Sequence, residues 1–282
     1  MSGYVTIEQS CPTHHQQDHF LTDNNSLYKI HPKTLFIGQN SHYLPSCQST
    51  NDEAADLIAR TDPPEGTLVI TDKQLAGRGQ RGNVWLAEPG QNLTFSTIFR
   101  PHFLAPTEQF WLNIALSVGI SDTLIPLTDR LLRVKWPNDL YVENQKLGGI
   151  LIENTIQGQS LAWSVVGLGL NVNQTRFDLP TATSLQARFP LPEGYNLPGL
   201  LTTLCEHIEK RYLQLKAGHR AALKATYLQR LFRYQELHPY RNVRTGEQFE
   251  GTIVGVDETG QLALMVEGQV RYVHFKEIEV VF

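Results

Sequence analysis

The sequence predicts an α+β protein of two domains. One long helix, four successive strands and two further helices are predicted between residues 107 and 234, whereas past Leu237 only short strands and turns follow. A chain of 282 residues is long enough for one large domain and a small appendage, but not for three ordinary domains. We therefore expect a larger domain over residues 31–235, in which helices pack on a sheet, and a small β-barrel over residues 236–282.

The first hundred residues contain a tail, a helix and two strands. Residues 1–30 are polar and lack sustained periodicity, so we expect a flexible N-terminal segment. The spacing of Thr50-Asn51-Asp52-Glu53 is that of a capping box and predicts a helix that begins just after Ser49. Residues 66–72 and 93–99 are typical of strands, and the glycine-rich residues between them predict a loop.

The remaining elements follow from apolar spacing and turn residues. Thr107 is a candidate cap for a long helix, because apolar residues recur at helical spacing as far as Ile125. The other expected elements are strands at 131–136, 140–143, 149–153 and 161–170, helices at 200–215 and 221–234, and strands near 249–256, 261–266, 269–275 and 278–282.

Composition excludes several classes of protein. With 41% hydrophobic and 18% charged residues, the chain falls among ordinary folded proteins. A formal net charge of -4 supplies no sequence-wide positive field for nucleic acid. The first twenty residues contain no apolar block, so we expect neither a secretory signal nor a membrane span there. We therefore expect a cytoplasmic protein. Three cysteines, far apart, offer no disulfide framework.

The run from Gly77 to Gly82 (GRGQRG) brings three glycines and two arginines to one loop. Backbone N–H groups and guanidinium groups suit phosphate or carboxylate oxygens. A basic surface loop explains this hexapeptide equally well. No Gly-Lys-Ser/Thr follows it, so an ordinary Walker-type kinase is disfavoured.

Three further motifs combine polar groups with strand ends. Residues 135–139 (KWPND) form a corner that can hold an amide and a carboxylate at a sheet edge, although a plain turn is a common use of Asn138 and Asp139 and is favoured when this motif is taken alone. Lys146 begins a glycine-containing strand, where its ammonium can lie over an anion or simply face solvent. Residues 167–173 (GLGLNVN) end a buried strand with glycines that permit close approach.

In this order and spacing the motifs resemble those of the biotin protein ligases, and the resemblance covers nearly everything from Ser49 to Phe282. It implies a catalytic domain with a mixed sheet backed by helices, of the class II synthetase-like kind, followed by an SH3-like barrel. It also implies an ATP-dependent enzyme that forms biotinyl-5'-AMP from biotin and ATP. Biotin is then transferred to a lysine of the biotin carboxyl carrier domain of acetyl-CoA carboxylase or a related carboxylase.

The resemblance assigns roles to individual residues. It implies three catalytic residues, namely Lys146, Arg78 and Asp139. The ammonium of Lys146 lowers the repulsion between the biotin carboxylate and the α-phosphate, and Arg78 contributes to the same effect. Asp139 orients the acceptor amine. Short hydroxyl and amide groups suit the ureido ring of biotin, which offers two donors and one acceptor. The implied biotin-binding residues are Ser49, Thr50, Asn51, Gln74, Arg78, Gly79, Gln80 and Lys146.

A second group of residues is assigned to ATP. The resemblance implies Arg81, Trp85, Asn138 and Asn171, with Trp85 stacking near the adenine, although an ordinary core tryptophan is the alternative. Mg²⁺ is expected to neutralise the phosphates and the departing pyrophosphate, and no fixed protein metal site is expected.

The sequence departs from the family at two places. Many members have arginine where this sequence has Gln80, and the loss of that charge is expected to weaken retention of the mixed anhydride unless Arg81 compensates. Fewer than fifty residues precede Ser49, and they show no pair of helices with a recognition-helix pattern. We expect the form without an N-terminal DNA-binding domain and no DNA binding, as a monomer or a homodimer.

Two other functions compete with biotin ligation. Lipoate- or octanoate-transferring enzymes resemble biotin ligases in fold and also modify a carrier lysine, but the Trp136–Asp139 corner and the C-terminal barrel favour biotin. A non-enzymatic sensor of biotin or nucleotide is the other candidate. The charges of Arg78, Asp139 and Lys146 favour the enzyme, because simple binding does not require so much charge near an anionic centre.

Overall fold

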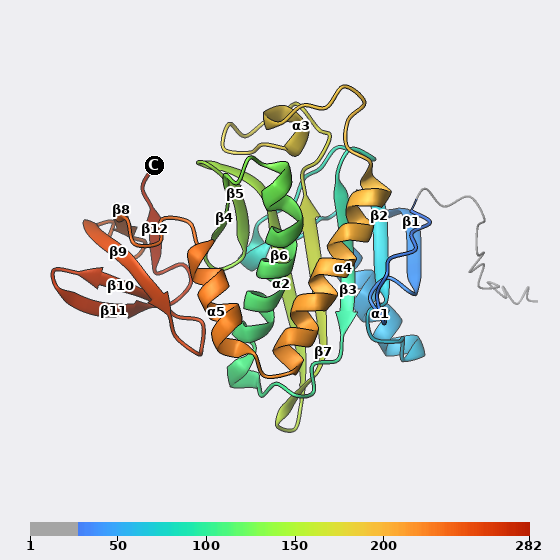
Figure 1. Ribbon diagram of the computed structural model, residues 1–282, viewed down its shortest axis with the longest axis horizontal. Coiled ribbons are helices and arrows are strands. Elements are labelled where there is room, and N and C mark those ends of the chain that lie inside the picture. The colour runs from blue at the N-terminus through green and yellow to red at the C-terminus, as the bar shows by residue number, and fades with distance from the viewer. Residues whose placement is uncertain (1–27) are drawn as a thin grey trace, which may run out of the picture.

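The computed structural model describes residues 28–282, apart from the side chain of Arg81. A seven-stranded sheet lies at its centre, and a five-stranded sheet stands at one end (Figure 1). In sheet order, the large sheet contains β1 (Ser41–Cys47), β2 (Leu68–Gln74), β3 (Leu93–Phe99), β7 (Ser160–Leu170), β6 (Gln145–Gln157), β5 (Asp139–Val142) and β4 (Leu132–Lys135). The strands β1 and β2 are parallel and all other neighbours are antiparallel, so the predicted mixed sheet is confirmed.

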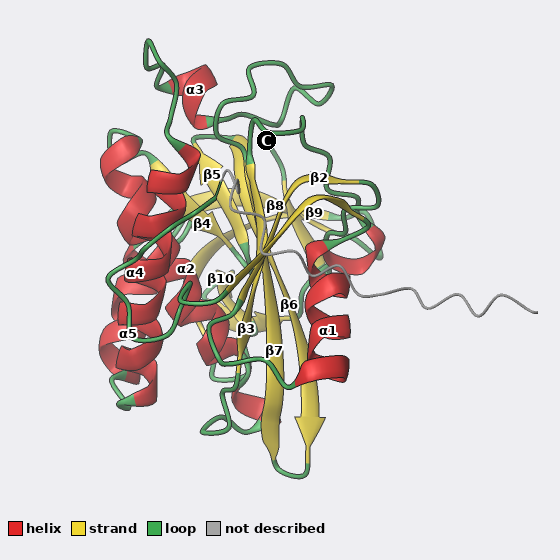
Figure 2. Cartoon of the chain, turned by 90° about the vertical axis from the view of Figure 1, so that its right-hand side faces the viewer, coloured by secondary structure: helices red, strands yellow, loops and turns green. Residues whose placement is uncertain are grey.

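Helices cover both faces of this sheet. The helices α2, α4 and α5 lie on one face and α1 lies on the other (Figure 2). The helical segments are α1 (Thr50–Thr61), α2 (Phe110–Leu124), α3 (Leu185–Arg188), α4 (Leu197–Lys216) and α5 (Arg220–Gln229), with short 3-10 turns η1 (Gln80–Gly82), η2 (Pro106–Glu108) and η3 (Ile125–Leu127).

Helix α2 is the central helix of the core. The helical segment Pro106–Leu127 is long and apolar enough to cross a membrane, but 72% of an apolar 18-residue window within it is buried inside the protein, against the sheet and α4. A helix that is apolar all round is typical of such a buried position. Gly119 allows α4 to come close, because a Cβ atom there would lie 2.8 Å from the Cα atom of Ile208.

The C-terminal sheet packs directly on the larger domain. Its order is β11 (Gln269–Val273), β10 (Leu262–Val266), β9 (Gln248–Val256), β8 (Leu237–Asn242) and β12 (Ile278–Val280), all antiparallel. The indole N–H of Trp136 donates to the carbonyl of Gly260 at 2.9 Å, and the ring of Phe275 meets that of Trp136 edge to face. The small sheet is therefore held beside the Trp136–Asp139 corner.

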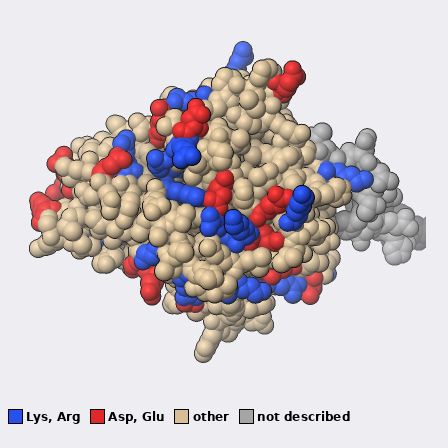
Figure 3. Space-filling view, viewed as in Figure 1, with Lys and Arg blue, Asp and Glu red and all other residues tan. Residues whose placement is uncertain are grey.

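Charged side chains are distributed without a large patch of one sign on the face seen in Figure 3. Acidic and basic residues are intermixed there, in keeping with the formal net charge of -4. This pattern is typical of an ordinary solvated surface.

Several helix boundaries differ from those predicted. Helix α1 begins at Thr50, directly after its N-cap Ser49, as predicted, but the hydroxyl of Thr50 bonds to Gln74 and Ser96 instead of closing a capping box. Thr107 does not cap α2, because Pro106 opens a separate 3-10 turn before it. Helix α5 ends at Gln229, five residues early, since Phe232 donates its N–H to the carbonyl of Val134 and continues the sheet edge.

The packed part of the chain begins earlier than predicted. Tyr28 and Ile30 are buried in the main core, although both fall in the segment 1–30 that the sequence predicts to be flexible. Residues 1–27 lie outside the described part of the chain. Because the apolar side chains at positions 28 and 30 are not part of a longer periodic run, the sequence did not indicate that this segment is packed.

Glu209 in α4 fixes this N-terminal region to the helix layer. Its buried carboxylate accepts hydrogen bonds from the backbone N–H groups of Leu35 (2.6 Å), Phe36 (2.8 Å) and Ile37 (3.0 Å). We expect Glu209→Ala to lower the free energy of unfolding by about 3 kcal/mol, because three donors lose their acceptor. Denaturant unfolding measures this loss. Glu206→Ala is the matched control, since Glu206 accepts one exposed N–H, that of Lys33, and should cost less than about 1 kcal/mol. Equal losses for the two variants contradict the assignment.

Candidate active site

An open cleft of about 700 Å³ lies on the face of the large sheet that carries α1. The N-terminus of α1, the loop after β2, the starts of β5 and β6, the C-terminal end of β7 and Phe275, in the turn between β11 and β12, surround it. The structure brings together most residues predicted for the site, namely Ser49, Thr50, Asn51, Gln74, Arg78, Gly79, Gln80, Trp85, Asn138, Asp139 and Lys146. Such a cleft, partly apolar with a few convergent polar groups, is typical of a small-molecule site.

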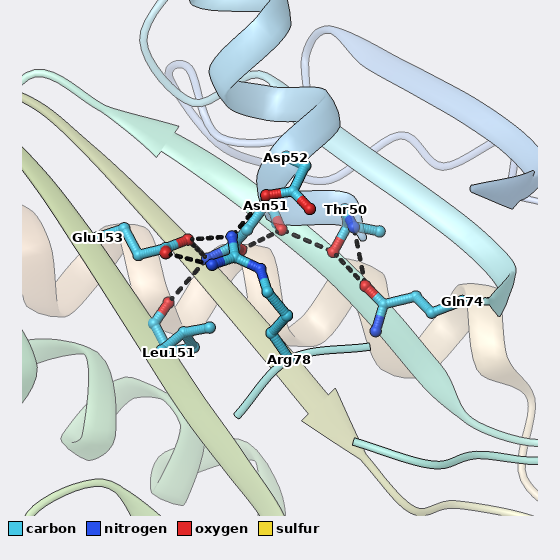
Figure 4. A network of polar contacts seen from close by, with 8 residues as sticks. Thr50, Asn51, Asp52, Gln74, Arg78, Leu151 and Glu153 are labelled. Atoms are coloured by element: carbon cyan, nitrogen blue, oxygen red, sulfur yellow. Dashed lines mark hydrogen bonds and ion pairs between the residues drawn. The ribbon is translucent and has the colours of Figure 1, made fainter. Parts of the chain in front are cut away.

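A connected set of polar side chains, buried except for the half-buried Gln74, forms the floor of the cleft beside α1 (Figure 4). The Oε1 atom of Gln74 accepts from the backbone N–H of Thr50 at 2.8 Å and from its hydroxyl at 3.2 Å. The hydroxyl of Ser96 lies 2.7 Å from that of Thr50 and 2.6 Å from Oδ1 of Asn51. These contacts fix each group in one place before any ligand binds.

Arg78 extends over this floor toward α1 (Figure 4). Its guanidinium donates to both carboxylate oxygens of Glu153, at 2.8 and 2.9 Å, and to Asp52 at 2.6 Å. Burial opposes the charge of the group, but the ion pairs with Glu153 and Asp52 outweigh it and raise the pKa of Arg78 above its ordinary value. In this structure Arg78 is therefore fixed by two carboxylates.

Lys146 and Asp139 form an ion pair on the opposite side of the cleft. The Nζ atom of Lys146 lies 2.6 Å from Oδ1 of Asp139, and each side chain is about one third exposed, at 35% and 29%. Gly149 leaves room for this pair, because a Cβ atom there would lie 3.1 Å from Oδ1 of Asp139 and 3.3 Å from Nζ of Lys146. The backbone N–H of Lys146 donates to the carbonyl of Thr181 at 2.7 Å, which holds the start of β6 in place.

A second lysine, Lys135, lies behind this pair. Its Nζ atom is 3.3 Å from the hydroxyl of Tyr141 and lies over the ring of Phe282. Burial, assisted by the nearby charge of Lys146, lowers the pKa of Lys135, while Asp139 acts in the opposite direction. Burial and then Asp139 raise the pKa of Tyr141 to about 12.

The residues predicted for ATP are not all gathered in the cleft. Trp85 packs its ring on Gly169, where a Cβ atom would lie 2.3 Å from Cε2 of the indole, and Asn138 donates its amide to the carbonyl of Ile150. Asn171 is buried just outside the cleft, with Nδ2 donating to the carbonyl of Thr183 at 2.9 Å. Among the described residues, Oδ1 of Asn171 and Nε1 of Trp85 have no hydrogen-bond partner. The side chain of Arg81 lies outside the described part.

The loop of residues 77–82 has Gly-x-Gly-x-x-Gly spacing, but its surroundings are not those of a dinucleotide-binding fold. In that fold the glycines lead from a strand into a long helix. Here they lead into the single 3-10 turn η1, and the N–H of Trp85 returns to the carbonyl of Gly77 at 2.9 Å. The loop therefore covers the cleft instead of opening a helix.

Three residues of the site were missed in the sequence. Glu153 is the single carboxylate of β6, and Ser96 is one of three hydroxyl residues of β3, so neither position differed from an ordinary strand residue. Phe275 reaches the cleft from the turn between β11 and β12, and no local pattern in the sequence indicated it. Within residues 28–282, no group of three or more His, Cys, Asp or Glu side chains is arranged to hold a metal ion.

Comparison with known proteins assigns this architecture to a class of ligases. The model of the biotin/lipoate A/B protein ligase family matches residues 43–171, which include most of the cleft. The biotin protein ligase from Aquifex aeolicus, solved in complex with biotin and ATP, superimposes with a TM-score of 0.70. That alignment covers 86% of this chain and 99% of the other at 23% identity, so it shows a common fold.

Two relatives narrow the class to one family. The bifunctional ligase/repressor BirA of Bacillus subtilis (strain 168) is 32% identical over 258 residues, which are 88% of this chain and 76% of that protein. The biotin–[acetyl-CoA-carboxylase] ligase of Mycobacterium tuberculosis is 29% identical over 254 residues, 85% of this chain and 90% of that protein. The chain belongs to the biotin protein ligase family.

Proposed function

We propose that this protein activates biotin with ATP and transfers it to one lysine of a biotin carboxyl carrier domain, that of acetyl-CoA carboxylase or a related carboxylase. A carboxylate oxygen of biotin attacks the α-phosphorus of ATP, pyrophosphate leaves, and biotinyl-5'-AMP is formed. The lysine amine of the carrier then attacks the acyl carbon, an amide bond forms, and AMP leaves.

The observation that carries this proposal is the polar floor made by Thr50, Asn51, Gln74 and Ser96, with Lys146 across the same cleft. A ureido ring has two donors and one acceptor and can satisfy such groups when it displaces water. The dithiolane ring of lipoate has no comparable groups and would cover the amide nitrogen of Gln74 without offering it an acceptor, which costs about 1–3 kcal/mol. The floor therefore supports biotin over lipoate.

The ion pair of Lys146 and Asp139 supports the chemical steps. An ammonium fixed near the biotin carboxylate and the α-phosphate lowers the repulsion between the two anions and stabilises the charge that develops during attack. Asp139 both holds Lys146 and offers a carboxylate that can accept a hydrogen bond from the incoming amine. One group thus serves each half-reaction.

The nucleotide is proposed to lie beside Trp85. Nε1 of Trp85 and Oδ1 of Asn171 have no hydrogen-bond partner in the described part of the chain and are polar atoms that a purine can satisfy, and the indole provides stacking area. Mg²⁺ would arrive with the phosphates of ATP, since this ion is commonly bound through substrate phosphates and one or two carboxylates. It would neutralise the phosphate charge, and the polar atoms of the chain would orient the nucleotide.

Gln80 offers a direct test of adenylate retention. It lines the cleft, and its Oε1 is buried without a partner among the described residues. We expect Gln80→Arg to slow the release of biotinyl-5'-AMP by roughly 10-fold, because an added guanidinium can form a charge-assisted hydrogen bond with the phosphate. Release is measured by chasing preformed labelled adenylate with unlabelled biotin. Gln91→Arg, in the loop before β3, is the control for added charge; faster or unchanged release in Gln80→Arg contradicts the prediction.

The acceptor is tested with purified carrier domains. Incubation with biotin, ATP and Mg²⁺ should add biotin to one lysine of an acetyl-CoA carboxylase carrier domain, detected by intact-protein mass spectrometry. The same carrier with that lysine replaced by arginine is the control, and a lipoyl domain serves as the competing acceptor. Modification of the lipoyl domain alone, with no biotin on the carboxylase carrier, would overturn the assignment of the acceptor.

A further inference from the structure

We infer that Glu153 is a positioning residue of the biotin pocket: its carboxylate fixes the orientation of the Asn51 amide and, through Asn51, the direction in which the hydroxyl groups of Ser96 and Thr50 donate on the floor of the cleft. The inference rests on the proposed function, because it concerns how the same pocket recognises the head group of biotin.

The carboxylate determines which end of the Asn51 amide faces which neighbour. Nδ2 of Asn51 donates to Oε2 of Glu153 at 2.6 Å and lies 3.4 Å from the carbonyl of Leu151, so Oδ1 must point the other way, toward Ser96. A carboxylate accepts and never donates when ionised, so this contact permits one orientation of the amide. Gly167 allows Asn51 to lie against β7, since a Cβ atom there would be 2.4 Å from Oδ1.

The orientation of Asn51 is passed on to its neighbours. Ser96 has a single hydroxyl hydrogen and gives it to Oδ1 of Asn51, so the 2.7 Å contact between the hydroxyls of Ser96 and Thr50 takes its hydrogen from Thr50. At the other end, the backbone N–H of Thr50 can only donate, so Oε1 of Gln74 faces it. The amide nitrogen of Gln74 is therefore turned away from Thr50 (Figure 4), where it can donate to an acceptor such as the ureido oxygen.

An ionised glutamate is needed at position 153 because three donors meet there. Arg78 donates to both oxygens and Asn51 donates to one of them. A glutamine has one acceptor oxygen and must turn its NH₂ group toward Arg78 or Asn51, both of which are donors. If the Asn51 amide reverses in response, Ser96 faces an NH₂ group and gives its hydrogen to Thr50. The floor then presents a different set of donors.

The test compares Glu153→Gln with Asp52→Asn in the full chain. Asp52→Asn is the matched control, because it removes the other carboxylate on Arg78 without contacting Asn51. Biotin binding is measured by calorimetry without nucleotide, and the KM values of biotin and ATP from pyrophosphate release. Glu153→Gln should raise the Kd and KM of biotin roughly 10- to 100-fold, as for loss of a hydrogen bond to a charged group. The KM of ATP, kcat, and all constants of Asp52→Asn should change less than about threefold.

A double-mutant cycle separates positioning of Asn51 from a loss of charge. In an Asn51→Ala background, Glu153→Gln should cost little further biotin affinity, because the amide that it orients is absent. Ser96→Ala breaks the next contact and should reproduce the selective loss of biotin affinity if Glu153→Gln does not fold. An undiminished effect in the Asn51→Ala background, or an equal rise in the KM of ATP, contradicts the inference. Wild-type protein that binds no biotin contradicts the proposed function itself.

Discussion

Lys146→Ala is expected to lower the rate of biotinyl-adenylate formation by about 1,000-fold, the largest effect of any single substitution in the cleft. Its ammonium lies across the cleft from the polar floor beside α1 and forms an ion pair with Asp139 at 2.6 Å. The side chain of Lys146 is only partly exposed. Removing it leaves two anions to approach each other without a fixed positive charge. A loss of this size corresponds to about 4 kcal/mol of transition-state stabilisation.

The measurement is single-turnover formation of the adenylate, with biotin binding determined in parallel. Lys146→Arg should recover only part of the rate, because a planar guanidinium does not place its charge as a compact ammonium does. Lys216→Ala, at the exposed C-terminal end of α4, is the control for removing a surface charge and should keep the full rate. A loss of less than about 10-fold in Lys146→Ala would remove the main electrostatic role from this residue.

The second large effect is expected from Gly169→Val. A Cβ atom at this position would lie 2.3 Å from Cε2 and 2.6 Å from Cζ2 of Trp85, so a branched side chain displaces the indole from β7. Trp85 sits in a partly exposed loop and can move without unfolding the sheet. We expect the KM of ATP to rise by about 100-fold, in line with the loss of a well-packed aromatic contact, while biotin affinity changes little.

Gly255→Val in β9 is the matched control for this substitution. It also places valine at a strand glycine, but a Cβ atom there meets nothing within 4 Å. Thermal unfolding of both variants separates a local displacement of Trp85 from loss of the fold. If Gly169→Val binds ATP as the wild type does, Trp85 is an ordinary packing residue and not part of the nucleotide site.

The secondary structure followed the apolar patterns closely where the strands were buried. β3 was predicted with its observed ends, and β2, β4, β5 and β7 within two residues, because continuous or alternating apolar runs are a direct consequence of burial. Strands β1 and β8 were missed. β1 lies at the sheet edge with mostly exposed or half-buried side chains and contains Pro45, so it lacks the apolar run of a buried strand.

Local patterns in the sequence could not predict the order of the strands in the sheet. β3 pairs with β7, which is sixty residues further along the chain, and this pairing brings Thr94 opposite Gly169 in the wall of the cleft. Such a contact depends on how the whole sheet assembles, and the sequence of neither strand alone indicates its partner. For the same reason, the sequence did not predict that Phe275 lines the cleft.

The motifs predicted most of the residues that line the cleft, but not how those residues are bonded. Arg78 was predicted to share the electrostatic role of Lys146, but the sequence did not predict that its guanidinium contacts Glu153 and Asp52. A carboxylate within an apolar strand gives no indication of its partner, so Glu153 was not recognised. Asn171 was expected around the nucleotide and is buried just beside the cleft, where its Oδ1 still lacks a partner among the described residues.

The identity of the activated acid is the most direct test of the central claim. Purified protein is incubated with ATP and Mg²⁺ and, separately, with biotin or lipoate, and the acyl-adenylate is identified by mass spectrometry. The account predicts biotinyl-5'-AMP with release of pyrophosphate, and no lipoyl-AMP, because the polar floor beside α1 requires a head group with donors and an acceptor. Lipoyl-AMP in its place, or no adenylate from either acid, would contradict it.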